Sequence, residues 1–246
     1  MELDKELESE LDQDQQLDFF SFKKQLEIDK EDFCKEVYKE RKESIQIKKE
    51  KTVVKNLEKI FDATFRICTR KGFRGMSMRD LSQESGLSMG ALYSYFRSKE
   101  ELLNTLQRVG NSFIQRILEE SALGKENAFI RLRLTIKTHL YLSEIVQPWF
   151  YFSYMEAKSL CKKERDFYKQ AELYTENLIL NILEEGAEQG LFQQREHKMA
   201  ASVIKAMLQD WYLKRWKYAK RNVTVDHYAD FILGFIESFY LLKENN

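Results

Sequence analysis

Glycine and proline are scarce in this chain, and neither occurs before position 72. The 246 residues include nine Gly and one Pro, and the first Gly is Gly72. Because these two residues end helices and form turns, a chain poor in both and rich in Leu, Glu, Lys and Gln is expected to be nearly all helix. The length suits one large domain or two smaller ones with a sizeable core. We therefore predict an all-α fold.

Charge is distributed unevenly along the chain, although the formal net charge is zero. Residues 1–22 hold eight acidic residues and one Lys, whereas residues 51–105 hold ten Lys or Arg and six acidic residues. The zero net charge is therefore the sum of an acidic tail and a basic block, and a basic block is compatible with a nucleic-acid partner.

The residue types that usually carry catalysis or metal binding are scattered. The Cys and His residues are Cys34, Cys68, Cys161, His139, His197 and His227. Their spacing indicates neither a disulfide framework nor a zinc site, and no phosphate-binding Gly loop or catalytic triad pattern is present. The acidic N-terminus is unlike a secretory signal, and no apolar run approaches the ~20 residues of a spanning helix. We expect a cytoplasmic protein without enzyme activity, cofactor, metal or membrane partner.

Three helix starts fall within residues 77–101. Ser77 precedes a short predicted helix over residues 78–85, and Ser88 precedes a second over residues 89–96. Gly86 lies between them, and Ser98 with Glu101 forms a capping box for a long helix from Lys99 to about residue 121. Apolar residues that would hold the two short helices at a fixed angle are Leu81, Leu87, Leu92 and Phe96. This pattern is typical of a helix-turn-helix that inserts its second helix into the major groove of DNA.

Small residues begin the second short helix, where the backbone would approach the bases. Gly90 inside a helix costs about 1 kcal/mol relative to Ala, and a close approach to DNA is a reason to keep it. The residues expected at DNA are Ser77, Arg79, Ser88, Met89, Gly90, Ala91, Tyr93, Ser94, Tyr95 and Lys99, with Lys48, Lys49 and Lys51 as an N-terminal arm. The alternative is an ordinary helical corner with Tyr93 and Tyr95 as surface packing.

The same segment resembles the tetracycline-repressor (TetR, or TetR/AcrR) family of bacterial transcription factors. Residues 60–73, IFDATFRICTRKGF, are similar to its first helix, and SMGALYSYFRSKEELL matches its pattern of small residues, Leu-Tyr, an aromatic residue, Phe and Lys-Glu. The resemblance implies an N-terminal three-helix DNA-binding domain followed by a larger helical domain for ligand binding and dimerisation. It also implies that Tyr93 and Lys99 contact phosphates, and that Arg79, Met89, Gly90, Ala91 and Tyr95 lie nearest the bases.

We expect three regions: an N-terminal extension over residues 1–50, the helix-turn-helix domain over 51–103, and the ligand-binding and dimerisation domain over 104–246. The extension is an acidic tail followed by a loose helical pattern from Phe19. It is interpreted as an extra helix on its own domain, a flexible tail, or an arm for another protein. The other predicted helices span about 52–71, 127–145, 149–161, 165–187, 197–219 and 225–243, with a break at Pro148.

The last two predicted helices carry apolar residues at helical spacing and are the candidate dimer surface. The family resemblance supports this choice, because its members dimerise through a four-helix bundle of equivalent helices. The residues are Met199, Val203, Ala206, Met207, Asp210, Tyr228, Ile232, Phe235, Ile236 and Phe239. The alternative is that these faces pack only within one chain.

An aromatic run over residues 149–154 suggests a cavity for a small apolar or aromatic effector. The candidate pocket residues are Phe113, Tyr141, Trp149, Phe152, Met155 and Tyr174, and ordinary core packing is the alternative for each. By resemblance, an effector bound here would release the protein from DNA.

The leading hypothesis is thus a ligand-responsive dimeric repressor on a pseudo-palindromic operator of double-stranded DNA. The second is a DNA-binding protein of the same fold that a protein partner controls through residues 1–50. The third is an enzyme or interaction protein in which the helix-turn-helix has no role.

Overall fold

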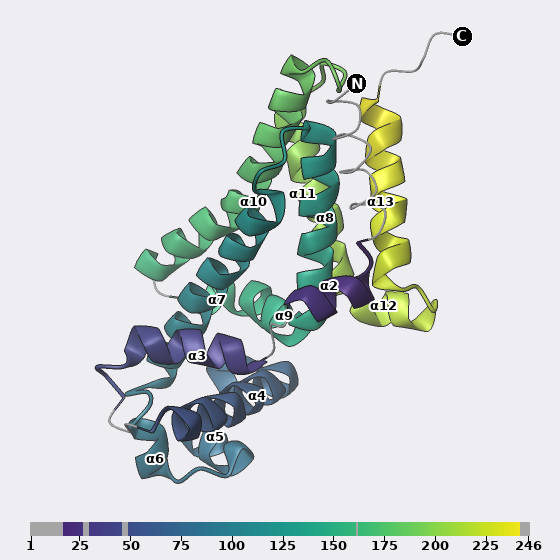
Figure 1. The fold of residues 1–246 in the computed structure, drawn as a ribbon. Coiled ribbons are helices and arrows are strands. Elements are labelled where there is room, and N and C mark those ends of the chain that lie inside the picture. Colours follow the sequence, from purple (N-terminus) through teal and green to yellow (C-terminus); the bar gives the residue numbers. More distant parts are fainter. Residues whose placement is uncertain (1–16, 27–29, 46–48, 161, 242–246) are drawn as a thin grey trace. The chain divides into compact units, whose positions relative to one another are not determined.

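The computed structural model describes residues 17–26, 30–45, 49–160 and 162–241. Within them every extended regular element is a helix, beside an isolated bridge between Phe192 and Leu241, so the predicted all-α fold is confirmed. The elements, shown in Figure 1, are α2 (Phe19–Leu26), α3 (Lys30–Arg41), α4 (Glu50–Gly75), α5 (Met78–Ser85), α6 (Met89–Tyr93), α7 (Lys99–Ala122), α8 (Ala128–Ile145), α9 (Gln147–Glu156), the short 3₁₀ turn η1 (Ala157–Ser159), α10 (Lys162–Glu188), α11 (His197–Leu213), α12 (Arg215–Lys220) and α13 (Val225–Tyr240).

Several helix ends differ from the predicted ones. The helix expected to stop at residue 71 continues as α4 to Gly75, with a break at Gly72, whose φ of 70° favours glycine. Pro148 lies in the first turn of α9, where its missing N–H costs nothing. The helix expected over residues 197–219 is divided at Lys214 into α11 and α12.

The chain divides into two compact units. Unit 1 comprises residues 1–26, 114–147 and 171–246, and unit 2 comprises residues 27–113 and 148–170, so α7 and α10 each contribute to both. The boundaries expected after residues 50 and 103 do not coincide with the ends of these units. The proposed division at those residues therefore stays a prediction.

Unit 2 is built around α4, against which α3 and α5 pack. The buried face of α4 carries fully buried Leu57 and Ile60 at helical spacing. Helix α9 adds Phe152, whose ring centroid lies 5.3 Å from that of Phe65. Trp149 packs directly on Gly110, where a Cβ atom would come within 2.2 Å of the indole, so only glycine fits. Segments far apart in sequence therefore complete one core.

The described part of the N-terminal extension packs on both units. In unit 2, α3 buries Cys34, Val37 and Tyr38 in the core around α4. In unit 1, the ring centroid of Phe22 in α2 lies 5.4 Å from that of Tyr141 in α8. Of the three interpretations of the extension, packing on the chain itself describes residues 17–26 and 30–45. Residues 1–16 lie outside the described part.

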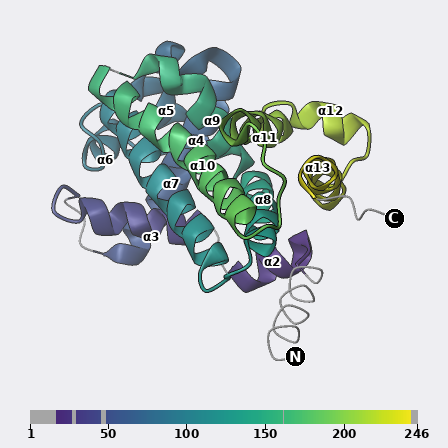
Figure 2. The same ribbon diagram turned by 90° about the horizontal axis from the view of Figure 1, so that it is seen from above.

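Unit 1 is built around α8, which packs against α2, α11 and α13 (Figure 2). Most of α8 is buried, as its central position requires. Its C-terminal end is fixed by Glu144, which accepts hydrogen bonds from Arg215 at 2.8 Å and from the indole of Trp211 at 3.1 Å. In the described segments of both units, no helix is long and apolar enough to cross a membrane.

Candidate nucleic-acid interface

A complete capping box fixes the start of α5. The Ser77 hydroxyl accepts a hydrogen bond from the Asp80 N–H at 3.2 Å, and the Asp80 carboxylate accepts one from the Ser77 N–H at 2.8 Å. Hydrogen bonds from the Ser77 hydroxyl and from Lys71 hold the pKa of Asp80 well below its usual range. This reciprocal arrangement satisfies two of the free N–H groups at the helix start.

The turn between α5 and α6 depends on Gly86 and two serines. Gly86 adopts the left-handed conformation, with φ 70° and ψ 15°. The Ser82 hydroxyl donates to the Leu87 carbonyl at 2.6 Å, and the Ser88 hydroxyl accepts from the Ala91 N–H at 3.2 Å. The chain thus leaves one short helix and enters the next with both ends capped, which is the local geometry of a helix-turn-helix.

Helix α6 presents one face to solvent and buries the other. Leu92 is buried beneath it, whereas Gly90 is exposed with open space around its Cβ position and the Tyr93 side chain is 50% exposed. Met89, Ala91 and Ser94 are partly exposed, and Ser88 is exposed. A short helix with small residues on its free face can approach another surface closely.

The structure corrects the expectation for Tyr95. Helix α6 ends at Tyr93 rather than at residue 96, and the chain then turns inward, so Tyr95 and Phe96 are buried. The Tyr95 hydroxyl accepts a hydrogen bond from the Asn56 side chain in α4 at 2.9 Å. The prediction that Tyr95 lies near DNA bases is therefore wrong, and its role is to pack α6 onto α4.

Lys99 has a structural role beside the one predicted for it. Its ammonium donates to the carbonyls of Phe73, Arg74 and Met76 at 2.8 to 3.3 Å, and it lies 5.0 Å from the centroid of the Phe73 ring. The carbonyls of Phe73 and Arg74 lie in the last turn of α4 and that of Met76 follows it, where a cation is favourable. Lys99 therefore joins the start of α7 to the end of α4, and its phosphate contact stays a prediction.

Arg41 is a residue of this site that the sequence reasoning missed. It lies in α3, and its guanidinium donates to the Tyr95 carbonyl at 3.0 Å, to Glu101 at 2.8 Å and to the Thr105 hydroxyl at 3.2 Å. It also lies 4.9 Å from the centroid of the Phe96 ring. The N-terminal extension thus holds the segment that follows α6 in place. No local motif marks this contact, because the partners are 54 to 64 residues away.

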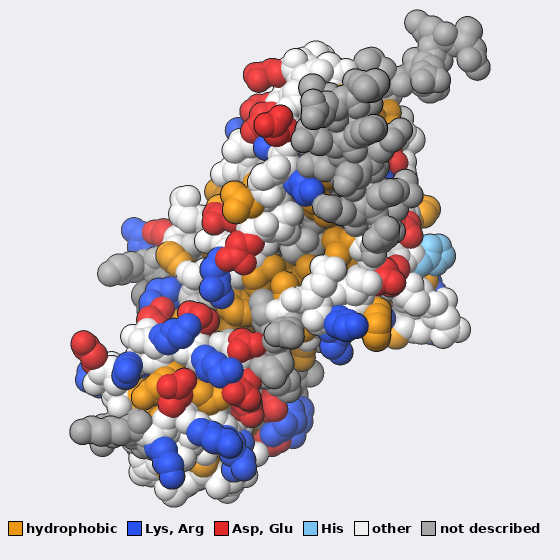
Figure 3. Space-filling model, viewed as in Figure 1, with side chains coloured by type: hydrophobic (Ala, Val, Ile, Leu, Met, Phe, Trp, Pro, Cys, Tyr) orange, Lys and Arg blue, Asp and Glu red, His pale blue; other side chains and the backbone are white. Residues whose placement is uncertain are grey.

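Exposed cations surround the short helices. Arg79 in α5 is exposed, as are Lys49 and Lys51 at the start of α4, while Lys48 lies outside the described residues. Arg74 and Arg97 are further exposed cations that were not singled out. In Figure 3, Lys and Arg side chains recur over the part of the molecule that holds α3 to α6, interspersed with acidic ones. One acidic residue of this region, Glu84, is paired with Arg70 and Arg66, whose hydrogen bonds hold its pKa below the usual range.

Comparison with known proteins identifies this region. Residues 60–106, from the middle of α4 into α7, match the family model described as bacterial regulatory proteins, tetR family. Residues 60–106 of this chain therefore resemble the tetR-family regulators. The relative PksA of Bacillus subtilis strain 168, an HTH-type transcriptional regulator, is 31% identical over 103 residues, which cover 40% of this chain and 50% of PksA. The chain thus spans half the length of that relative.

Solved structures of TetR-family regulators extend the likeness to the rest of the chain. PfmR from Thermus thermophilus is 27% identical with a TM-score of 0.65, over 76% of this chain and 99% of PfmR. The structure of AibR in complex with isovaleryl coenzyme A and operator DNA has a TM-score of 0.64 at 19% identity, over 73% of this chain and 97% of AibR. The helical C-terminal part therefore has a TetR-family fold as well.

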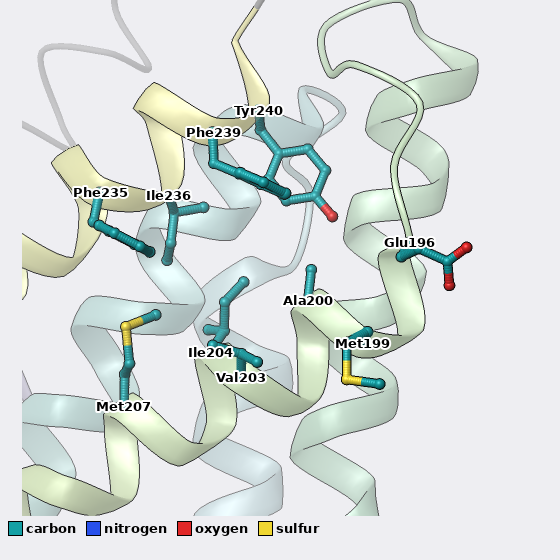
Figure 4. A pocket seen from close by; sticks show the side chains of 10 residues that line it. All are labelled: Glu196, Met199, Ala200, Val203, Ile204, Met207, Phe235, Ile236, Phe239 and Tyr240. Atoms are coloured by element: carbon teal, nitrogen blue, oxygen red, sulfur yellow. The ribbon is translucent and has the colours of Figure 1, made fainter.

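In unit 1, α11 and α13 expose large apolar side chains along one face. Met199 is 64% exposed, Phe231 69% and Phe235 54%, and Val203 and Phe239 are also exposed. A groove of about 260 Å³ runs between the two helices (Figure 4). Its lining residues are Glu196, Met199, Ala200, Val203, Ile204, Met207, Phe235, Ile236, Phe239 and Tyr240.

Four of the residues predicted for the dimer surface belong instead to the interior or to local pairs. Tyr228, Ile232 and Ile236 are buried within the chain, and of these Ile236 also lines the groove. Asp210 accepts hydrogen bonds from Lys214 and Lys217, each at 2.6 Å. Helix α13 has two apolar stripes, which cannot be told apart by spacing: residues 228, 232 and 236 are buried, whereas 231, 235 and 239 are exposed. Phe231 was missed for the same reason, while Ala206 is exposed and Met207 partly exposed.

The six residues predicted to line an effector pocket do not converge. Phe113, Trp149 and Phe152 are buried in unit 2, whereas Tyr141 is buried in unit 1 beneath α2 and donates to Asp226 at 2.7 Å. Met155 is exposed, and Tyr174 donates to Glu119. Each therefore has its own packing partner or faces solvent, which is the core-packing alternative. A common pocket formed by these six residues is not what the structure shows.

Proposed function

We propose that this chain is a transcriptional regulator that binds a pseudo-palindromic site on double-stranded DNA as a homodimer and is released by a small effector. Helix α6 enters the major groove, and α5 and the start of α7 lie along the flanking phosphates. Repression is the expected sign of regulation, because a bound dimer blocks access to the DNA that it covers.

The solvent-facing surface of α6 is the observation that carries the proposal. The helix is capped at Ser88 and held from below by Leu92, and it presents Gly90 and Tyr93 outward. Arg79 is placed on α5 to reach a phosphate or a guanine edge. An ordinary helical corner does not require an exposed Gly in a five-residue helix. Close approach of the helix backbone to a base pair does require a residue that small.

A second copy of the chain is the proposed occupant of the apolar face of α11 and α13. Exposed Met and Phe side chains at helical spacing have a hydrophobic driving force for association. A two-fold dimer doubles the DNA contacts and matches a palindromic site, with the two α6 helices one helical turn or a multiple apart.

The effector is proposed to be small and apolar or aromatic, and to bind in unit 1. The structure of AibR is a complex with isovaleryl coenzyme A and operator DNA, so a protein of this fold binds both kinds of partner. The competing idea, control by a protein through the N-terminal extension, would leave apolar residues of that extension exposed. Phe22, Cys34 and Val37 are buried, which favours the small effector, whereas Phe20 is 76% exposed and is the apolar residue of the extension that a protein partner could contact.

Selection of bound DNA fragments followed by fluorescence anisotropy tests the proposal. If each α6 region contacts ~4 phosphates, a dimer should show a slope of about −7 for log affinity against log salt concentration. Tyr93→Phe should weaken every site equally, and Arg79→Ala should also relax sequence preference. Tyr154→Phe, at an exposed Tyr outside α4 to α7, is the matched control and should change nothing. A slope near zero, or unaltered binding by both variants, contradicts the proposal.

A further inference from the structure

A lysine and a histidine lie together in the interior of unit 1. Lys205 in α11 is 7% exposed and His139 in α8 is 1% exposed, and the Lys205 ammonium lies 3.4 Å from Nε2 of His139. Burial holds the pKa of both groups below their usual values. A charged ammonium in an apolar core is costly unless it has a counter-ion or several hydrogen bonds, and the His139 ring can offer Lys205 at most one acceptor nitrogen.

No carboxylate in the described part of the chain forms an ion pair with Lys205 within 4.0 Å. The carboxylates of Glu172 and Glu176 on α10 raise the pKa of Lys205 only through longer-range electrostatic attraction. Their side chains bond to neutral groups of α11: Gln209 donates to Glu172, and the Ser202 hydroxyl donates to Glu176 at 2.7 Å. Ser202 and Gln209, about one turn before and after Lys205, thus donate hydrogen bonds to these carboxylates.

Two more hydrogen-bonding groups lie buried near His139 on α8. Thr135, one turn before it, and the adjacent Thr138 are both fully buried, and neither hydroxyl has a hydrogen-bond partner among the described residues. Buried hydroxyls are nearly always bonded, so each of these is unusual. The helix that carries His139 thus holds two hydroxyl donors without an acceptor, and Lys205, beside His139, has no carboxylate partner within 4.0 Å in the described segments.

We propose that the effector of this regulator is an apolar carboxylate whose negative group pairs with Lys205 between α8 and α11. The inference rests on the proposed function and narrows its effector class. A carboxylate would supply the missing counter-ion and accept hydrogen bonds from the threonine hydroxyls. The surrounding core residues Ile136, Leu140 and Leu208 are buried aliphatic side chains that suit an apolar tail. Entry of the carboxylate requires α8 and α11 to part, which couples binding to a change in unit 1.

The stability of Lys205→Met distinguishes a ligand-binding role from a structural one. If Lys205 serves the fold as counter-ion of Glu172 and Glu176, its removal lowers the Tm of the free protein. If it is reserved for a ligand, Met fills the same space without a buried charge, and the Tm rises by roughly 2–4 °C or more. A lower Tm overturns the proposal.

Matched ligand pairs test the chemistry directly in the full-length dimer. The probes are decanoate, phenylacetate and 2-naphthoate, each beside its primary amide, measured by thermal shift and by release of a bound DNA fragment. At least one acid should raise the Tm and release DNA at a concentration at which its amide does neither. Lys205→Met should lose this response at least tenfold, and Lys205→Arg should recover part of it.

Three outcomes overturn the proposal: equal action of an acid and its amide, an unchanged response in Lys205→Met, or no response to any acid. DNA binding without ligand is scored separately. If the chain binds DNA but does not respond to the acids, the carboxylate effector is refuted and the proposed DNA-binding function is not. If the wild-type chain does not bind DNA, the proposed function itself is refuted.

Discussion

The free face of α6 in unit 2 and the free face of α11 and α13 in unit 1 expose different kinds of side chain. Helix α6 exposes Gly90 and Tyr93 near the cation Arg79, above a fully buried core. The other face exposes Met199, Phe235 and similar large apolar residues around a groove. A helix face with small side chains among cations suits a grooved polyanion such as DNA. A face with large apolar side chains suits another protein surface.

The difference shows that exposure alone says little about function, whereas the chemistry of the exposed groups and the rigidity beneath them say more. Beneath α6 lie caps, Gly86 and the Arg41 bonds, which fix the orientation of a five-residue helix. The α11 and α13 face is supported by two long helices that need no such devices. Reading a base sequence requires a fixed short element, while association of two copies requires mainly apolar area.

The largest expected effect follows from placing a charge on the apolar face. Phe235→Glu removes a side chain whose burial in a dimer would contribute about 1.5–3 kcal/mol, once from each copy. Dimerisation should therefore weaken by roughly 10²–10⁴-fold, since 1.4 kcal/mol is a factor of ten. Analytical ultracentrifugation measures the change, and DNA affinity should fall with it.

The matched control is Phe20→Glu, at a side chain of α2 that is 76% exposed and does not line the groove. Its dimerisation should be that of the wild type. If both variants remain dimeric at micromolar concentration, the α11 and α13 face is not the dimer surface, and its apolar residues require another partner.

A smaller effect is expected from Arg41→Met, which tests the support beneath α6. The guanidinium makes charged hydrogen bonds to Glu101 and to the Tyr95 carbonyl, and such bonds contribute about 1.5–3 kcal/mol. Urea unfolding should show a loss of this order, and DNA affinity should fall at temperatures at which the variant is still folded. The dimer constant should stay unchanged.

Arg108→Met is the control for Arg41→Met. Arg108 in α7 pairs on an exposed surface with Glu40, which lies in α3 beside Arg41. Exposed ion pairs contribute about 0–1 kcal/mol, so this variant should be nearly neutral. Wild-type DNA affinity in Arg41→Met would show that α6 holds its orientation without the N-terminal extension.

The same contrast explains which features were predictable from sequence. Capping residues and Gly86 act on neighbours within four positions, so the helix-turn-helix was predicted with nearly correct ends. The burial of Tyr95 depends on Asn56, and the contacts of Arg41 depend on residues more than 50 positions away, so neither has a local signature. On α13, both stripes are apolar, and periodicity cannot tell the inward stripe from the outward one.

The aromatic run over residues 149–154 was misinterpreted for a related reason. An apolar or aromatic side chain packs equally well against a core or a ligand, so composition does not separate these roles. Trp149 packs on Gly110 and Phe152 on Phe65, and neither partner is close in sequence. By contrast, Lys205 and His139 are unusual only once their burial is known, which the sequence does not supply.

The smallest expected effects come from two glycines that lie on the two compared faces. Gly90 in α6 and Gly234 in α13 both have helical neighbours and open space around their Cβ positions. Either change to Ala should therefore stabilise the free chain by about 0.5–1 kcal/mol, because Ala loses less backbone entropy. Gly110→Ala, which would collide with Trp149, should destabilise it and serves as the contrast.

The binding consequences of these two stabilising changes should then diverge. Gly90→Ala should lower DNA affinity and leave the dimer intact, if the α6 backbone lies against base edges. Gly234→Ala should weaken the dimer and affect DNA only through it, if α13 lies close to its counterpart. Denaturation, ultracentrifugation and anisotropy on the same preparations separate the three quantities. A stabilised Gly90→Ala with full DNA affinity would mean that α6 stands off from the bases and that other residues read the sequence.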